Sequence, residues 1–318
     1  MPDGFCTYFD SRYLTRGLAL WASLRQHAGE CELFVLCMDD AALDALRRLS
    51  LPGLIPIPLR DLEEDDPELA AAKTTRSPIE YYFTTTPALP LHILRRAPQL
   101  ESITYLDADL WFFGGIDALR QELGGGSIGI IAHRFPPRIA HMSRWGIYNV
   151  GLVMFRNDAR GRAVLEWWRA RCIEWCYDRI EANRFADQKY LDRWPSQFEG
   201  VVVIAHKGAN VAPWNAENHE LRDGGGRILV DDAPLLFYHF HGLRRWSASL
   251  WQLGFVRYGA RPPRVLIDRV YLPYIAALQR WDARLEHMTT LPPLRYRPRL
   301  LDVVRFPLHL ATRELIVV

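Results

Sequence analysis

The sequence predicts an α/β fold with one open, largely parallel sheet and helices on both of its faces. Short apolar runs alternate with stretches whose apolar residues recur at helical spacing, and strand–helix–strand alternation produces this architecture. The length of 318 residues and the hydrophobic content of 49% allow a large core, in one domain or in two smaller ones. Aromatic residues make up 12% of the chain and no long block of like charges occurs, which excludes an intrinsically disordered protein.

The N-terminal elements follow this alternation. Leu14, Leu18, Trp21 and Leu24 recur at the spacing of one helical face. Prolines in the third apolar run place it at an edge of the sheet, because proline cannot donate a backbone hydrogen bond. We expect a strand over 5–9, a helix over 14–27, a strand over 33–37, a helix from Asp39 or Asp40 through Leu49, and the edge strand over 54–57.

The second half adds further strands and a helix rich in tryptophan. A helical stretch over 116–123 ends at glycines. One helical face carries Val164, Trp168, Cys172, Trp175 and Cys176. We expect strands over 102–106, 128–132, 150–155, 201–205, 227–230 and 235–240.

The C-terminal part differs in composition, so we divide the chain into a main domain over 1–256 and an extension over 257–318. The extension is rich in proline, has a helical stretch near 270–287, and carries a net charge of +6 from 11 arginines and 5 acidic residues. Two interpretations stay open: the extension packs on the domain, or it docks on an anionic membrane surface. We favour packing, because each basic residue near a membrane adds only about 1 kcal/mol.

Composition and missing motifs exclude several classes of function. The net charge of +2 does not indicate a nucleic-acid-binding protein. No apolar run approaches the roughly 18 residues of a membrane span, and the P-loop and H-E-x-x-H motifs do not occur. The five cysteines argue against a disulfide framework, and the first residues lack the pattern of a secretory signal. We therefore expect a cytoplasmic protein.

Two motifs have a structural explanation. The segment 124–129 matches G-x-G-x-x-G by letter, but it follows a helix and leads into a strand, so we interpret it as a helix end and turn. Cys172 and Cys176 lie on an apolar helical face without a second ligand pair, which favours buried apolar residues over a metal site.

An Asp-x-Asp motif follows the strand over 102–106. Asp107 and Asp109 point to the same side, because side chains two residues apart do so in an extended chain. Two such close carboxylates repel unless a cation lies between them, and their hard oxygens suit Mg²⁺ or Mn²⁺ bridging a diphosphate. A solvated turn is the other interpretation. Ligands of open α/β sheets bind beyond the carboxyl ends of the strands, which adds Asp10.

Two histidines, His239 and His241, lie at the end of the strand over 235–240. A histidine at a strand end is usually only hydrogen-bonded. Here it becomes a candidate metal ligand together with Asp107 and Asp109, because the two strand ends can face one crevice.

The chain resembles the nucleotide-sugar-dependent glycosyltransferases of the GT-A fold, and among them the retaining family 8 enzymes, which include glycogenin and bacterial lipopolysaccharide glycosyltransferases. The resemblance covers about residues 4–247 and implies a Rossmann-like open mixed sheet with helices on both faces, followed here by the extension. The matching motifs occur in the family's order and are Tyr105-Leu106-Asp107-Ala108-Asp109, the segment 148–155, Asp187-Gln188-Lys189-Tyr190-Leu191, Pro213-Trp214-Asn215 and His239-Phe240-His241-Gly242.

The resemblance implies a role for each matching residue. Asp107 and Asp109 would hold the metal with His239, or with His241 in its place. Asp187 and Gln188 would lie near the anomeric carbon of the donor. Asp10 would lie near the base, Asn149 at the sugar, and Arg245 at the diphosphate in place of the family's lysine. The full set of residues expected to bind the donor is Thr7, Tyr8, Asp10, Arg76, Asp107, Asn149, Gly151, Gly242 and Arg245.

The chain departs from the family pattern in three segments. No proline follows Arg245, and the segment around Arg76 matches only partly. His133-Arg134-Phe135 has no family counterpart, and both a contact to acceptor or phosphate and a surface loop stay open for it.

The resemblance implies a metal-dependent, hexosyltransferase-like enzyme that moves a sugar from an NDP-sugar, with a UDP-sugar favoured, to a hydroxyl acceptor with retention. The cofactor would be Mn²⁺ or Mg²⁺, and the acceptor a glycan, a glycolipid or a small hydroxyl compound in bacterial polysaccharide or glycolipid synthesis. Asp187 and Gln188 lie at the start of a predicted helix over 188–193, and adjacent helical residues point about 100° apart, so only one of the two can face the anomeric carbon. Gln188 in that position favours retention. The alternatives are an inverting GT-A transferase with Asp187 as general base and a non-catalytic domain that binds a sugar nucleotide or glycan.

Overall fold

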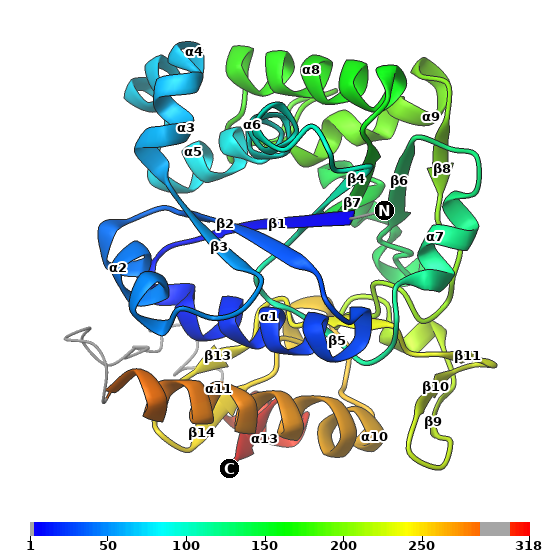
Figure 1. Ribbon diagram of the computed structural model, residues 1–318. Helices are drawn as coiled ribbons and strands as arrows, with labels where there is room; N and C mark the ends of the chain where they lie inside the picture. Colours follow the sequence, from blue (N-terminus) through cyan, green and yellow to red (C-terminus); the bar gives the residue numbers. More distant parts are fainter. Residues whose placement is uncertain (1–2, 287–305) are drawn as a thin grey trace.

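The computed structural model describes residues 3–286 and 306–318 and is built around a seven-stranded sheet between two layers of helices (Figure 1). The strand order is β3-β2-β1-β4-β7-β6-β8. The four strands from β3 to β4 are parallel, whereas β7 runs antiparallel to both β4 and β6, so the sheet is mixed. The strands are β1 (Asp3–Phe9), β2 (Glu32–Cys37), β3 (Leu54–Pro58), β4 (Ser102–Leu106), β6 (Ile128–Ala132), β7 (Tyr148–Arg156) and β8 (Val201–Val203).

Alternation of side chains along the strands gives the sheet two apolar faces. In β2, Leu33 and Val35 join one core cluster, while Phe34 and Leu36 join the other. α1, α2 and α7 supply residues to the first cluster, and α4, α5, α6 and α8 to the second. The helices are α1 (Leu14–Ala28), α2 (Asp40–Leu49), α3 (Leu59–Asp65), α4 (Pro67–Ala72), α5 (Pro78–Thr85), α6 (Ala88–Arg96), α7 (Asp117–Leu123), α8 (Ala159–Glu174) and α9 (Trp194–Gln197).

The predicted helix ends have the expected chemistry. Asp39 caps α2 by accepting a hydrogen bond from the backbone of Ala42. α7 ends at Gly124, whose φ of 49° favours glycine, so the glycine-rich segment is a helix end as predicted. Cys172 and Cys176 are both buried, but α8 stops at Glu174, so Cys176 lies beyond the helix that the apolar spacing predicted.

Two of the predicted strands lie outside the main sheet. The expected strand over 235–240 is β12 (Phe237–His239), which pairs antiparallel with β5 (Leu110–Phe112). It does so because the chain leaves the main sheet after the Asp-x-Asp motif, so that β5 offers an edge for pairing. The expected strand over 227–230 is β10 (Ile228–Val230), in a small sheet with β9 (Leu221–Asp223) and β11 (Ala233–Pro234).

The described part of the extension packs below α1 in the view of Figure 1. Trp281 of α11 meets Trp21 of α1 edge to face, with ring centroids 6.1 Å apart. Its elements are α10 (Arg264–Leu266), a π-helical turn (Ile267–Tyr271), α11 (Leu272–Glu286), α13 (Phe306–Ala311) and β15 (Leu315–Val317), which pairs with β14 (Leu250–Gln252) next to β13 (Arg244–Arg245).

The membrane-docking interpretation rests on 11 arginines, four of which lie outside the residues that the structure describes. Arg295, Arg297, Arg299 and Arg305 lie in the segment 287–305, outside the described residues. Within the described ranges, none of the helices combines the length and apolar character needed to cross a bilayer.

Candidate active site

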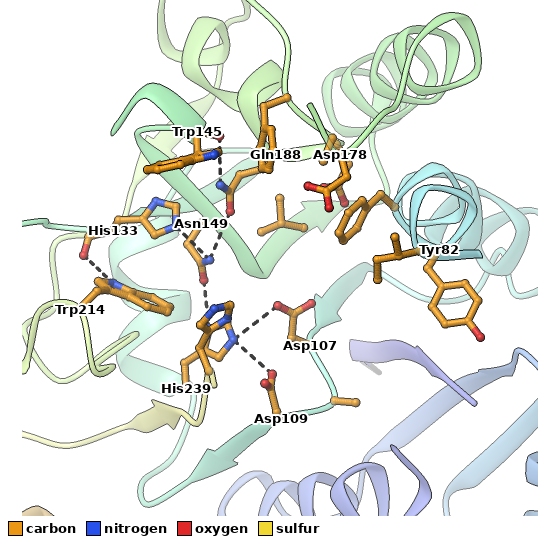
Figure 2. Close-up of a pocket in the computed structure, with 18 of the residues that line it drawn as sticks. Tyr82, Asp107, Asp109, His133, Trp145, Asn149, Asp178, Gln188, Trp214 and His239 are labelled. Atoms are coloured by element: carbon orange, nitrogen blue, oxygen red, sulfur yellow. Dashed lines mark hydrogen bonds and ion pairs between the residues drawn. The ribbon is translucent and has the colours of Figure 1, made fainter. Parts of the chain in front are cut away.

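A cavity of about 550 Å³ opens at the edge of the sheet where β1 and β4 end. β7 is antiparallel to β4, so it contributes its first residues to the same edge, and β12 adds its last residue. Asp107, Asp109, Asn149 and His239 all line this cavity (Figure 2). The polar side chains therefore meet beyond the carboxyl ends of the parallel strands, where open α/β sheets bind their ligands.

Asp107, Asp109 and His239 form one compact group. The Nε2 atom of His239 lies 3.2 Å from an Asp109 oxygen and 3.7 Å from an Asp107 oxygen. One ligand atom from each of the three residues falls within 4.8 Å of the others. Two carboxylates and one imidazole suit a divalent cation such as Mn²⁺, so the residues present fit the metal that the fold implies.

The surroundings shift the pKa values of the Asp107 and Asp109 carboxyls in opposite directions. Burial raises the pKa of Asp107 to about 6, against the attraction of His239. Burial also raises the pKa of Asp109, but His239 and the Arg16 guanidinium outweigh it and hold this pKa below its ordinary value. Arg16 lies 3.9 Å from an Asp109 oxygen. The group therefore concentrates negative charge on Asp109 and attracts a cation.

His241 lies beside His239 but outside the carboxylate group. The two imidazole centroids are 5.8 Å apart, and the Trp214 ring contacts both. Burial and repulsion from His239 lower the pKa of His241 to about 4, so its ring is neutral at pH 7. Of the two histidines that the sequence leaves open, the geometry places His239 with the carboxylates.

Asp187 faces the cavity immediately before the 3₁₀ helix η4 (Gln188–Arg193). The preceding residue, Ala186, has a φ of 46°, which residues other than glycine rarely adopt. Trp168 holds this turn by donating to the Asp187 carbonyl at 2.9 Å. Burial raises the pKa of Asp187 to about 7, against a hydrogen bond with Thr86, and repulsion from Asp107 raises it further.

Gln188, the next residue in the chain, also lines the cavity and is fixed by its neighbours (Figure 2). Its amide donates to the Trp145 carbonyl at 3.2 Å and accepts from Asn149 at 3.4 Å. Gly146 permits this placement, because a Cβ there would lie 3.0 Å from the Gln188 side chain. Its conformation is thus set before any substrate arrives.

The structure brings some of the predicted donor-binding residues to the cavity and leaves others outside it. Tyr8, Asp10, Asp107 and Asn149 line the wall. The Asp10 carboxylate accepts a hydrogen bond from the Tyr82 hydroxyl at 3.1 Å and pairs with Arg12. The predicted residues that do not line this cavity are Thr7, Arg76, Gly151, Gly242 and Arg245.

Arg76 and Arg245 have structural partners instead. Arg76 stacks on Tyr177 with its guanidinium 4.0 Å from the ring centroid and donates to the Ile173 carbonyl at the end of α8. Arg245 forms a 2.6 Å ion pair with Asp282 of α11. A carboxylate of the extension therefore holds Arg245 outside the cavity lining, and its contact to a diphosphate stays a prediction.

Sequence reasoning did not identify several residues of the wall, among them Tyr82, Trp145, Arg257 and Tyr258. No motif marks them, because they come from loops and short helices that only folding brings to the cavity. The sequence gives one indication for Arg16, which contacts Asp109: it is a charged residue among the apolar residues of the predicted helix over 14–27.

No family model matches the sequence. Two proteins of Bacillus subtilis (strain 168) are similar to most of its length. YfnD is 32% identical over 280 residues, covering 87% of this chain and 89% of YfnD. YfnF is 32% identical over 305 residues, covering 92% of this chain and 96% of YfnF. Both are described as uncharacterized proteins.

Solved structures with a similar fold are glycosyltransferases. The galactosyltransferase LgtC, in complex with donor and acceptor sugar analogs, superposes with a TM-score of 0.56 over 91% of this chain and 97% of LgtC, at 15% identity. Mouse xyloside xylosyltransferase 1 gives a TM-score of 0.50 over 76% of this chain and 98% of the mouse chain, at 14% identity. The chain therefore belongs to the family of YfnD and YfnF, and its fold is the GT-A fold of the nucleotide-sugar glycosyltransferases.

Proposed function

We propose that the protein is a metal-dependent glycosyltransferase that moves a hexose from an NDP-sugar, with a UDP-sugar favoured, to a hydroxyl group. The observation that carries the proposal is the group formed by Asp107, Asp109 and His239 on the wall of the 550 Å³ cavity. A divalent cation bound there would neutralise the charge that develops on the leaving diphosphate. An imidazole among the ligands favours Mn²⁺ over Mg²⁺.

The dimensions and lining of the cavity support a sugar nucleotide as donor. Its volume lies within the range of about 300–1,000 Å³ that small-molecule sites have. Tyr8 and Asp10 line one part of the wall, where Asp10 could accept from a base N–H, while Asn149 and Gln188 line another. The solved structures with a similar fold support a sugar donor, since LgtC is a galactosyltransferase and the mouse protein is a xylosyltransferase.

We propose transfer with retention, with Gln188 facing the anomeric carbon. An amide oxygen stabilises positive charge on the sugar but is not an effective base, which favours a route in which the leaving phosphate takes the acceptor proton. The inverting alternative has one observation in its favour, the pKa of Asp187 near 7, which suits a general base. The anomeric configuration of the product, measured by NMR, decides: an α-linked donor must yield an α-linked product, and a β-linked product overturns retention.

Thermal unfolding with NDP-sugars, with and without Mn²⁺, tests the donor class. A ligand at a hundred times its dissociation constant stabilises the fold by about 2.7 kcal/mol, so binding is readily detected. We expect stabilisation by one NDP-sugar that requires Mn²⁺, and no shift with any of them would contradict the proposal. Mn²⁺-dependent hydrolysis of the labelled donor then separates an enzyme from a domain that only binds sugar nucleotides.

The acceptor that we propose is a glycan, a glycolipid or a small hydroxyl compound, in bacterial polysaccharide or glycolipid synthesis in the cytoplasm. Phe83 and Trp145 at the cavity support a sugar acceptor, because aromatic rings offer it a flat apolar face. Ile79 and Met142 add apolar surface that suits a lipid-linked sugar. Transfer assays with the identified donor and each acceptor class test this assignment.

A further inference from the structure

Two backbone groups near β7 determine the hydrogen-bonding roles of three side chains beside the carboxylates. The first is the carbonyl of Ile147, which lies 3.2 Å from Nδ1 of His133. Because a carbonyl oxygen only accepts, Nδ1 of His133 carries the proton and Nε2 keeps its lone pair. Burial lowers the pKa of His133 to about 3, which keeps this ring neutral.

The second backbone group is the N–H of Gly151, which donates to Oδ1 of Asn149 at 3.1 Å. This bond fixes the orientation of the amide, so Nδ2 of Asn149 faces Nε2 of His133 at 3.3 Å and Oε1 of Gln188 at 3.4 Å. Each of the two backbone groups by itself thus requires this orientation of the Asn149 amide. Both hydrogens of the amide are used, and its oxygen faces the interior of the site.

The oxygen of the Asn149 amide determines that Nδ1 of His239 carries a proton. Nδ1 of His239 lies 3.3 Å from Oδ1 of Asn149, so Nδ1 is the donor and carries a proton (Figure 2). Nε2 then faces Asp107 and Asp109. Gly151 leaves room for this contact, because a Cβ there would lie 2.5 Å from Oδ1 of Asn149 and 2.8 Å from Nδ1 of His239.

We propose that His133 and Asn149 are positioning residues that hold the proton of His239 on Nδ1 and so present Nε2 to a divalent cation. The inference rests on the proposed metal-dependent function. A histidine ligand usually donates its other ring N–H to a fixed acceptor, and loss of such a partner weakens metal binding by about 10–100-fold. Here the acceptor is an amide that is itself oriented by His133 and by the backbone. The same amide joins the metal ligand to Gln188, so metal site and sugar site share one support.

The affinity of the protein for Mn²⁺ alone, measured by electron paramagnetic resonance without sugar nucleotide, tests the proposal. His133→Phe keeps a ring that can stack on Phe135, now 4.6 Å away, but removes the acceptor for Asn149. We expect about 10–100-fold weaker Mn²⁺ binding in His133→Phe and in Asn149→Leu. His133→Gln, whose amide oxygen can accept from Asn149, should recover part of the affinity.

Phe135→Leu is the matched control, because it alters the packing around His133 and keeps every hydrogen bond of the network. Its Mn²⁺ affinity should stay close to that of the unmodified protein. Equal affinities for the unmodified protein, His133→Phe and Asn149→Leu would overturn the inference while leaving metal-dependent transfer intact. A lack of Mn²⁺ binding by the unmodified protein would instead overturn the proposed function, and the inference with it.

A spectroscopic measurement on the unmodified protein keeps the inference testable if the variants fail to fold. In protein labelled with ¹⁵N-histidine and loaded with diamagnetic Zn²⁺, the His239 ring should show a proton on Nδ1 and a metal-shifted Nε2. A proton on Nε2, or a metal-shifted Nδ1, would overturn it.

Discussion

Asp107 is the residue at which binding and stability conflict most directly. Its carboxyl lies among Asp109, His239 and the hydroxyl of Tyr105, which donates to it at 3.0 Å. The raised pKa means that the folded protein holds a proton there more tightly than the unfolded chain does. In the absence of metal, ionisation of Asp107 therefore costs stability.

Asp107→Asn should abolish Mn²⁺-dependent donor binding and stabilise the metal-free protein above pH 6. The carboxyl has a folded pKa of about 6, so its contribution to stability is fully present below about pH 4 and is lost as the pH rises through 6. Asparagine has no such dependence. Its advantage in the free energy of unfolding should be small, because 31% of the Asp107 side chain is exposed.

Urea unfolding of both proteins at pH 4, 6 and 8, with EDTA present, measures this effect. Asp109→Asn is the comparison, because its lowered pKa reverses the sign and predicts a loss of stability at neutral pH. A variant at position 107 that keeps Mn²⁺-dependent binding would contradict the assignment of Asp107 as a ligand.

The turn that contains Phe255 and η6 (Val256–Tyr258) decides which arginine faces the cavity. Arg257 is exposed, lines the cavity and has no ion-pair partner among the residues that the structure describes. Arg245, on β13, is held by Asp282. We therefore expect Arg257, and not Arg245, to supply positive charge to a bound diphosphate.

Arg257→Gln should weaken binding of a nucleoside diphosphate with Mn²⁺ by about 10–100-fold, because hydrogen bonds to charged groups contribute about 1.5–3 kcal/mol. Arg245→Gln should leave that affinity within a few-fold and instead lower the free energy of unfolding by about 1–2 kcal/mol, since it leaves Asp282 partly buried and unpaired. Isothermal titration calorimetry and urea unfolding separate the two effects. A larger loss of affinity in Arg245→Gln would return the diphosphate contact to Arg245.

Glu314, just before β15, holds the same turn. Its carboxylate accepts from the backbone N–H groups of Gly254, Phe255 and Val256, at 2.8–3.2 Å. Burial raises its pKa to about 7, although these bonds oppose the shift. The C-terminal strand thus positions an element of the cavity wall.

Glu314→Gln should remove one pH-dependent contribution to stability. The folded pKa lies above the ordinary value of 4.5, so the native protein loses stability relative to the variant as the pH rises from about 4.5 to about 7. The difference in the free energy of unfolding should change by at most about 1.4 kcal/mol per pH unit in this window. Urea unfolding between pH 4 and 8 measures it, and a difference that does not vary with pH would show that the three N–H donors offset the effect of burial on this pKa.

At the scale of the whole molecule, the main domain and the described extension share one core cluster. Tyr274 of α11 stacks on Phe240, which follows β12, at 3.7 Å between centroids, and it meets Trp111 of β5 edge to face. His239 immediately precedes Phe240 in the chain. The extension therefore supports the strand that carries the proposed metal ligand.

Tyr274→Ala should destabilise the protein by about 3–5 kcal/mol, because it leaves a large cavity in this core. Tyr274→Phe should be neutral or slightly stabilising, because the buried Tyr274 hydroxyl has no hydrogen-bond partner among the described residues. Calorimetry should show a single unfolding transition for the unmodified protein and for Tyr274→Phe. Two separate transitions would indicate that the extension folds independently of the main domain.

Features that depend on local pattern could be predicted from the sequence. Apolar runs predicted the strands β1 to β4, β6 and β7, and helical spacing predicted α1 and α8. Asp39 marked the start of α2, and the segment 124–129 marked the end of α7. The helices α3 to α6 were not predicted. The Asp-x-Asp motif together with His239 or His241 gave the candidate metal group, because strand ends converge at one edge of such a sheet.

Tertiary structure alone decided the partners of each charge. The pairing of Arg245 with Asp282, the position of Arg257 on the wall and the choice of His239 over His241 depend on contacts between segments far apart in the sequence. The series of hydrogen bonds from Ile147 through His133 and Asn149 to His239 likewise requires each group to lie 3.2–3.3 Å from the next. Periodicity shows which face of an element is buried, but the identity of the atoms that meet there depends on how the whole chain packs.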